Sequence, residues 1–146
     1  MATLELKGFE DLEDAFRRIS EIPFEVTAEA LDKMAEVAAE KIRSTGETMG
    51  VRDEDSDVHI LDHIKPRKAK KEVWGGYEMI SFTGTRTRNS TGKRTRNAEI
   101  AFVNEYGKRG QPARPFIGTA MNRGADQIQD QAEKIIGDWI EKTFNQ

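Results

Sequence analysis

The sequence of 146 residues contains no cysteine, so disulfide bonds, thiolate metal sites and thiol catalysis are excluded. It has only two histidines. No apolar run approaches the roughly 20 residues needed to span a membrane. The first residues also lack the basic segment and apolar stretch of a signal peptide. We therefore expect a protein without a membrane partner, made in the cytoplasm.

Apolar residues are scarce at 36%, whereas charged residues reach 34%. Seven Phe, two Trp and two Tyr still provide enough bulk for a modest core. The apolar residues are periodic rather than scattered, which argues against a disordered chain. The length suits a single domain over residues 1–146, built around one core and carrying long polar loops.

The net charge of −3 conceals a strong division along the chain. Residues 1–64 carry 7 Lys and Arg against 17 Asp and Glu, whereas residues 65–123 carry 14 against 4. Such asymmetry is typical of a nucleic-acid-binding face. It is equally typical of subunits whose acidic and basic surfaces meet during assembly. The charge pattern alone leaves both interpretations open.

Two helices are predicted in the acidic N-terminal part. Apolar residues at spacings of three and four indicate an amphipathic helix over residues 9–21, with the stripe Phe9, Leu12, Phe16 and Ile19. Pro23 interrupts it, because the proline ring fixes φ and disfavours helix at the preceding residue. A second helix is predicted over residues 24–44, and Gly46 is the expected stop.

The middle third predicts short strands and loops. A short apolar element is expected at 58–64, and a strand or bent hairpin at 73–82, where Gly75-Gly76 permits a bulge. Residues 98–106 have even-spaced apolar side chains as in a strand, yet Asn97 and Gly107 suit the two ends of a helix. We favour a short helix there.

The last element is a long helix in whose first turn Pro115 is expected. The sum is an α+β fold in which two N-terminal helices and a long C-terminal helix pack on a small antiparallel sheet, with extended loops.

Residues 83–97 contain no aliphatic or aromatic side chain, a composition typical of a flexible basic loop or hairpin arm. Its cations could contact phosphates without sequence preference, an interaction that salt weakens. They could equally face an acidic surface of a neighbouring subunit. No aromatic residue in the arm could stack on bases, so nothing supports sequence-specific recognition. The candidate contact residues are Arg86, Arg88, Lys93, Arg94 and Arg96.

Catalytic and metal-binding patterns fail when tested against the sequence. The alternating Asp53, Asp55 and Asp57 resemble the start of a calcium loop, but the required glycine and glutamate are missing. His59 and His63 lack the motif of a zinc protease and an obvious third ligand. We therefore predict no catalytic residue, metal or cofactor, and a metal enzyme built on these two histidines is the weaker alternative.

One segment carries a resemblance to a known family. The sequence reads Phe102-Val103-Asn104-Glu105-Tyr106-Gly107, then a short turn, then Ala113-Arg114-Pro115-Phe116-Ile117 before the last helix. This resembles the hallmark of siphophage tail-completion and head–tail joining (neck) proteins, including prophage proteins similar to minor tail protein Z. The opening at Leu6 to Leu12 and the stretch from Val58 to Lys65 are also similar, although Val58 and His63 replace the family's usual glycine and serine.

The resemblance implies a non-enzymatic structural component of the virion, located at the neck or tail top and assembled in the bacterial host cytoplasm. Its implied partners are copies of itself, in an oligomeric ring, and adjacent head–tail connector or tail proteins, with non-specific contact to channel DNA as an option. The candidate interface or structural residues are Glu105, Tyr106, Gly107, Arg114, Pro115 and Phe116. The alternative is a DNA-binding protein that acts through its basic arm.

Physical reasoning gives three of these residues separate roles. Gly107 permits a tight turn with positive φ. Phe116 is expected to insert into the core and fix the entry of the last helix. Arg114 is expected to pair with a carboxylate such as Glu105, or with a neighbouring chain.

Overall fold

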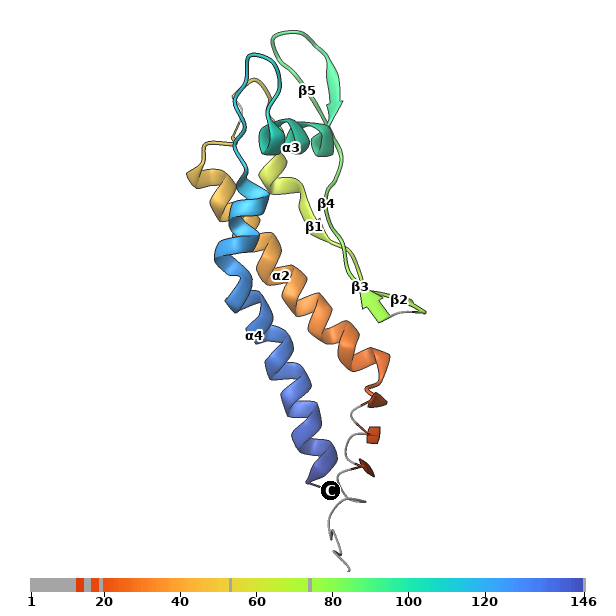
Figure 1. The fold of residues 1–146 in the computed structure, drawn as a ribbon. Coiled ribbons are helices and arrows are strands. Elements are labelled where there is room, and N and C mark those ends of the chain that lie inside the picture. Colours follow the sequence, from red (N-terminus) through yellow and green to blue (C-terminus); the bar gives the residue numbers. More distant parts are fainter. Residues whose placement is uncertain (1–12, 15–16, 19, 53, 74, 146) are drawn as a thin grey trace, which may run out of the picture.

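The computed structural model describes residues 13–14, 17–18, 20–52, 54–73 and 75–145. This part of the chain is α+β and elongated (Figure 1). Two long helices, α2 (Phe24–Thr48) and α4 (Phe116–Phe144), pack against each other and run in opposite directions. A shorter helix, α3 (Asn97–Tyr106), lies near the end where α2 stops and α4 begins.

Small residues bring α2 and α4 close together. Ala30, Ala35 and Ala38 are buried on α2. Gly124 is buried on α4, where an added Cβ would lie 3.1 Å from Cγ of Lys41. Because interhelical distance depends on side-chain size at the contact, the two backbones approach closely here. Farther along α4, the apolar residues Ile135, Ile136, Trp139 and Ile140 are only half-buried.

The main core lies at one end of this helix pair, where α2, α3, α4, strand β1 (Ile64–Pro66) and the short 3₁₀ helix η1 (Ile60–His63) meet. Phe116 is 0% exposed, and its ring meets that of Phe82 edge-on at 5.9 Å between centroids. The buried cluster comprises Ala39, Ile42, Val51, Ile60, Leu61, Ile64, Ala101, Phe116 and Ala120.

A long two-stranded ribbon lies along one side of α2. Its inner part pairs β1 with β4 (Ile80–Phe82), and its outer part pairs β2 (Lys70–Glu72) with β3 (Gly75–Tyr77). Between the two parts, three residues (67–69) oppose two (78–79), so one strand carries an extra residue, as in a β-bulge. The apolar element predicted at 58–64 corresponds to η1 and the start of β1.

The basic arm forms an antiparallel hairpin of β5 (Thr85–Thr87) and β6 (Arg94–Arg96). Its turn is tied to the rest of the molecule through Asp55, whose carboxylate accepts hydrogen bonds from the backbone N (2.8 Å) and Oγ (2.6 Å) of Ser90. The backbone oxygen of Asp55 accepts a further bond from the N of Asn89, at 2.9 Å. Of the two forms expected for this segment, a flexible loop or a hairpin arm, the structure has the hairpin, and its turn is anchored.

Two fold predictions are corrected. In the described ranges, three separate antiparallel pairs of three-residue strands take the place of the predicted single sheet. Gly46 does not stop the second helix, which continues to Thr48, before Gly50 with φ +67°. A Cβ at Gly46 would lie 2.6 Å from Cδ2 of Leu61, so this glycine makes room for the core.

Of the first predicted helix, the apolar stripe Phe9, Leu12, Phe16 and Ile19 lies outside the described residues. The predicted short helix at 98–106 is confirmed as α3, and its predicted end at Gly107 is also confirmed. Asn97 does not cap α3 with its side chain; its Nδ2 instead donates to the carbonyl of Thr83 at 2.7 Å.

Candidate functional site

Glu105 joins the end of α3 to the start of α4. Its carboxylate oxygens accept hydrogen bonds from the backbone N of Ile117 (2.8 Å) and of Gly118 (2.9 Å). These amides belong to the first turn of α4, where N–H groups have no partner inside the helix. The residue at the N-cap position, Pro115, makes no side-chain cap. A carboxylate is favourable there because the helix N-terminus is electropositive.

Arg114 does not pair with Glu105 as expected, because Glu105 caps α4 instead. The Nη1 of Arg114 donates to the carbonyl of Gly50, just beyond the end of α2. The backbone N of Arg114 donates to the carbonyl of Asn104 at 2.6 Å. Arg114 therefore links the ends of α2 and α3 to the start of α4.

Gly107 has φ +77°, a conformation that glycine adopts without steric cost. Its N donates to the carbonyl of Val103 at 2.8 Å and ends α3. A Cβ at this position would lie 2.8 Å from the backbone N of Ala113. Glycine is therefore needed at position 107 for two reasons, the positive φ and the close passage of the backbone at Ala113.

The predicted insertion of Phe116 into the core is confirmed, since its side chain is fully buried. Pro115 stands one position before α4 rather than inside its first turn. We call the set Glu105, Gly107, Arg114 and Phe116 the α3–α4 joint. Each of these residues makes contacts within the chain, so the joint supports the neighbouring surface, to which the exposed Arg114 also contributes.

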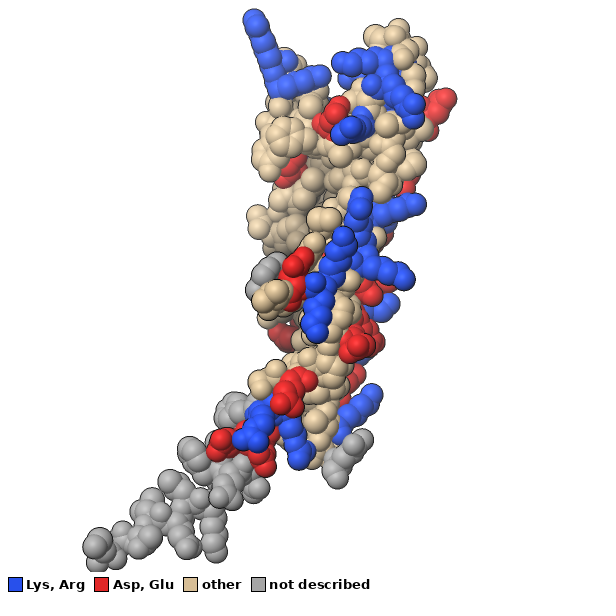
Figure 2. Space-filling model, turned by 90° about the vertical axis from the view of Figure 1, so that its right-hand side faces the viewer, with Lys and Arg blue, Asp and Glu red and all other residues tan. Residues whose placement is uncertain are grey.

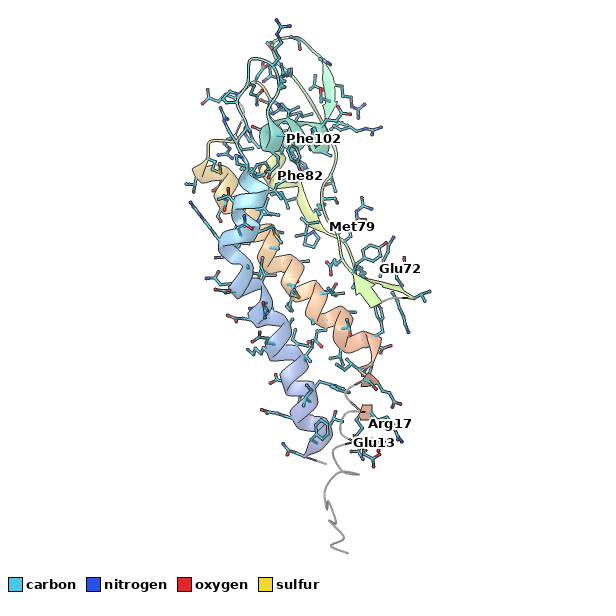
Figure 3. All side chains as sticks on the ribbon, in the orientation of Figure 1. Glu13, Arg17, Glu72, Met79, Phe82 and Phe102 are labelled. Atoms are coloured by element: carbon cyan, nitrogen blue, oxygen red, sulfur yellow. The ribbon has the colours of Figure 1, made fainter. Side chains whose placement is uncertain are left out.

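The surface beside the joint carries two exposed aromatic residues on α3. Phe102 is 63% exposed and Tyr106 is 69% exposed, and their rings lie 4.7 Å apart with a tilt of 49°. Figure 3 labels Phe102 on α3, with Phe82 below it on β4. Sequence reasoning singled out Tyr106 but missed Phe102 as its partner. The spacing of four residues was the available signal, once the segment is a helix.

The five predicted arm cations do not share one environment. Arg86 is only 3% exposed and is withdrawn from the surface, and Arg88 is half-buried. Lys93, Arg94 and Arg96 are exposed, and Nε of Arg94 donates to Oγ1 of Thr85 at 2.9 Å.

A cleft of about 480 Å³ separates the hairpin from α3. We call it the hairpin cleft. Five cationic side chains line it against two carboxylates, and its apolar lining comes from residues of the core and of α3. The lining residues are Val51, Arg52, Glu54, Arg86, Lys93, Thr95, Glu99, Ile100, Val103, Asn104, Lys108, Gln111 and Arg114.

Elsewhere, charges of both signs share one face of the molecule (Figure 2). Lys and Arg side chains follow the face that carries the ribbon, with Asp and Glu between them (Figure 2). A groove between the ribbon and α2 is lined by Asp32, Glu36, Arg67, Lys68 and Glu78, together with Pro66. Partial burial raises the pKa of Glu78 to about 7, and the facing carboxylates of Asp32 and then Glu36 add to the effect.

Over the described ranges, no three His, Asp or Glu side chains gather in a way that could hold a metal ion. His59 precedes η1 and His63 ends it, so the pair does not share one face of an α-helix. No helix in the same ranges is long and apolar enough to cross a membrane. Comparison with protein-family models, curated proteins and solved structures finds no match to this chain.

Proposed function

We propose that this chain is a structural component of a tailed-phage virion, a tail-completion or head–tail connector subunit that acts by assembly rather than by bond chemistry. The proposal places it at the neck or tail top, in contact with copies of itself and with adjacent connector or tail proteins. The observation that carries it is the exposed Phe102–Tyr106 pair, held rigidly beside the α3–α4 joint.

Two exposed aromatic rings in contact are unusual on a surface that binds nothing, because aromatic residues are enriched at the centres of protein interfaces. The segment that resembles neck proteins, residues 102–117, contains both rings and the whole joint. Its internal bonds fix the direction in which α3 presents the pair. That rigidity favours an interface whose geometry is set before the partner arrives.

The test is electron microscopy of lysates from a phage in which the gene for this chain is disrupted. We expect filled heads beside separate tails of normal length. Complementation with the native gene should restore joined particles, whereas Phe102→Ser with Tyr106→Ser should not. A matched control, Lys134→Glu on the exposed side of α4, should restore them. Intact infectious particles without any functional gene would contradict the structural role.

A second candidate function is non-specific DNA binding by the hairpin, favoured by the exposed Lys93, Arg94 and Arg96. It requires affinity for duplex DNA that falls steeply with salt, because counterions are released from each neutralised phosphate. Fluorescence anisotropy with a labelled duplex across a salt series measures this directly. Affinity that is unaffected by reversing these three charges would remove the candidate.

A further inference from the structure

The hairpin cleft has the size and position of a binding site. Its volume of about 480 Å³ falls within the range of pockets that hold small ligands or a few peptide side chains. One wall is the β5–β6 hairpin, and the contacts of Asp55 with Ser90 hold the turn of that hairpin in place. The opposite wall is α3, fixed by the joint. The cleft therefore has two supported walls.

The lining favours negative charge. Arg52, Lys93 and Lys108 are exposed cations on its rim. Arg86 is a buried cation in its lining, and Arg114 adds a fifth. These cations come from four separate segments of the chain, so folding, and not one basic run, brings them together.

The lining also contains features that suit a peptide better than a phosphate backbone. Val51, Ile100 and Val103 offer apolar surface. Glu54 and Glu99 would repel a ligand that repeats negative charge along its whole length, as nucleic acids do. A peptide can place carboxylates on the cations and turn N–H groups toward the two glutamates.

The exposed aromatic pair lies next to two lining residues of this cleft along the surface of α3. Phe102 follows Glu99 by three positions and Tyr106 follows Val103 by three, spacings that make side chains neighbours on a helix surface. A ligand that leaves the cleft along α3 therefore meets the two rings. Aromatic side chains at such a position typically contribute strongly to protein binding.

We infer that the hairpin cleft and the Phe102–Tyr106 pair form one docking site for an acidic segment of a partner protein in which carboxylates alternate with aliphatic side chains. The inference rests on the proposed function, because it specifies the chemistry of a partner in assembly. The carboxylates bind Lys93 and Lys108, and the aliphatic side chains pack on the cleft lining and on the two rings.

The experiment measures binding of full-length protein to a short fluorescent peptide of alternating Glu and Leu, at physiological ionic strength. Comparison probes are the same peptide with Lys in place of Glu, a polyglutamate peptide and oligothymidylate of equal charge. We expect the Glu–Leu peptide to bind most tightly. Lys93→Glu with Lys108→Glu should weaken its binding by about tenfold or more.

The matched control is Lys134→Glu with Lys142→Glu, which makes the same charge change on exposed residues of α4. It should leave peptide affinity within about twofold of the original, since remote surface charges are screened. Phe102→Ser with Tyr106→Ser should weaken binding of the Glu–Leu peptide while leaving the affinity for polyglutamate unchanged. That split separates the aromatic contribution from the electrostatic one.

Several outcomes would overturn the inference. One is equal affinity for the Glu–Leu and Lys–Leu peptides. Another is a loss of peptide affinity in the α4 control as large as the loss in Lys93→Glu with Lys108→Glu. Tighter binding of oligothymidylate through Lys93 and Lys108 would assign the cleft to nucleic acid. Self-association lost on reversal of those charges would make a second copy the occupant. If the peptide-binding experiment fails while the gene disruption still gives separate heads and tails, the docking site is rejected and the neck assignment stands.

Discussion

Gly107 and Phe116 fix the α3–α4 joint in different ways. Gly107 leaves space for the backbone of Ala113 while holding a left-handed conformation. Phe116 fills the centre of the core and meets Phe82 edge-on. Both residues were identified from the sequence. Their neighbours Glu105 and Arg114 were also identified, with Glu105 as one of the partners expected for Arg114, and within the chain the structure gives the two residues separate partners.

Substitution of Gly107 by alanine is expected to cost about 1–3 kcal/mol of unfolding free energy, the range for a non-glycine residue held in a left-handed conformation, with contact to Ala113 adding to it. Gly110→Ala is the matched control, because Gly110 has φ +81° but no atom within 4 Å of its added Cβ. Urea denaturation of both variants measures the difference. Equal losses of unfolding free energy in the two variants would mean that contact with the backbone of Ala113 contributes nothing to the cost.

Replacement of Phe116 by alanine is expected to destabilise the protein by about 3–5 kcal/mol, because it opens a cavity in the core. Phe102→Ala removes the same atoms from a residue that is largely exposed. That control should change stability by only about 0.5 kcal/mol. Thermal or urea denaturation compares the two variants. A small loss for Phe116→Ala would contradict its burial.

At the scale of elements, the two long helices could be predicted from the sequence because their apolar spacing extends over several turns. The start of α2 after Pro23, the short α3 and the long α4 all follow from periodicity, proline and glycine. The misplaced end of α2 has a physical reason. Gly46 is read as a helix stop by local rules, but the core needs its missing side chain to seat Leu61.

The strand pairs and the cleft could not be predicted in the same way. Strands of three residues are too short for an alternating pattern that would identify them or fix their register. The bond between Asp55 and Ser90 joins residues 35 positions apart, and no local motif announces it. Consequently the hairpin was predicted, whereas its anchor, its buried Arg86 and the cleft beneath it were not.

Loss of the Glu105 carboxylate should loosen the junction of two elements. Glu105→Ala is expected to cost about 1–2 kcal/mol, the usual effect of removing a helix cap. The amides of Ile117 and Gly118 should exchange with solvent faster than in the native protein. Glu99→Ala, which removes an exposed carboxylate at the other end of α3, is the control. Unchanged exchange at both amides would show that α4 does not depend on this cap.

At the scale of the whole molecule, the fold brings part of the basic region beside the acidic part of the chain. The basic ribbon lies against the acidic face of α2, and the backbone N of Ala69 donates to Asp32. Exposed cations lie on the ribbon, at Lys65, Arg67, Lys68, Lys70 and Lys71, as well as around the hairpin and its cleft.

Glu78 should make the stability of the whole fold depend on pH. Its pKa is raised from an ordinary value of 4.5 to about 7 by partial burial and by the facing Asp32. Between these two pH values the folded state binds more protons than the unfolded state, so the free energy of unfolding falls as pH rises. The contribution is complete below pH 4.5 and is lost as pH passes through about 7.

Urea midpoints at pH 5 and pH 8 test this coupling. Glu78→Gln should reduce the difference between the two midpoints and should be more stable than the native protein at pH 8. Glu72→Gln makes the same chemical change at an exposed site on the ribbon and should leave the difference unchanged. If the native protein gains stability relative to Glu78→Gln when the pH is raised from 5 to 8, the assigned direction of the pKa shift is wrong.

The pairing of α2 with α4 also governs the order in which the chain can fold. In the sequence, the ribbon, the hairpin and α3 all come between these two helices. During synthesis, α2 therefore leaves the ribosome long before the helix that covers its small-residue face. Closing so long a loop is entropically costly, so the final collapse waits for Phe116 and the residues after it. A chain stalled within the hairpin would expose the alanine face of α2 to chaperones.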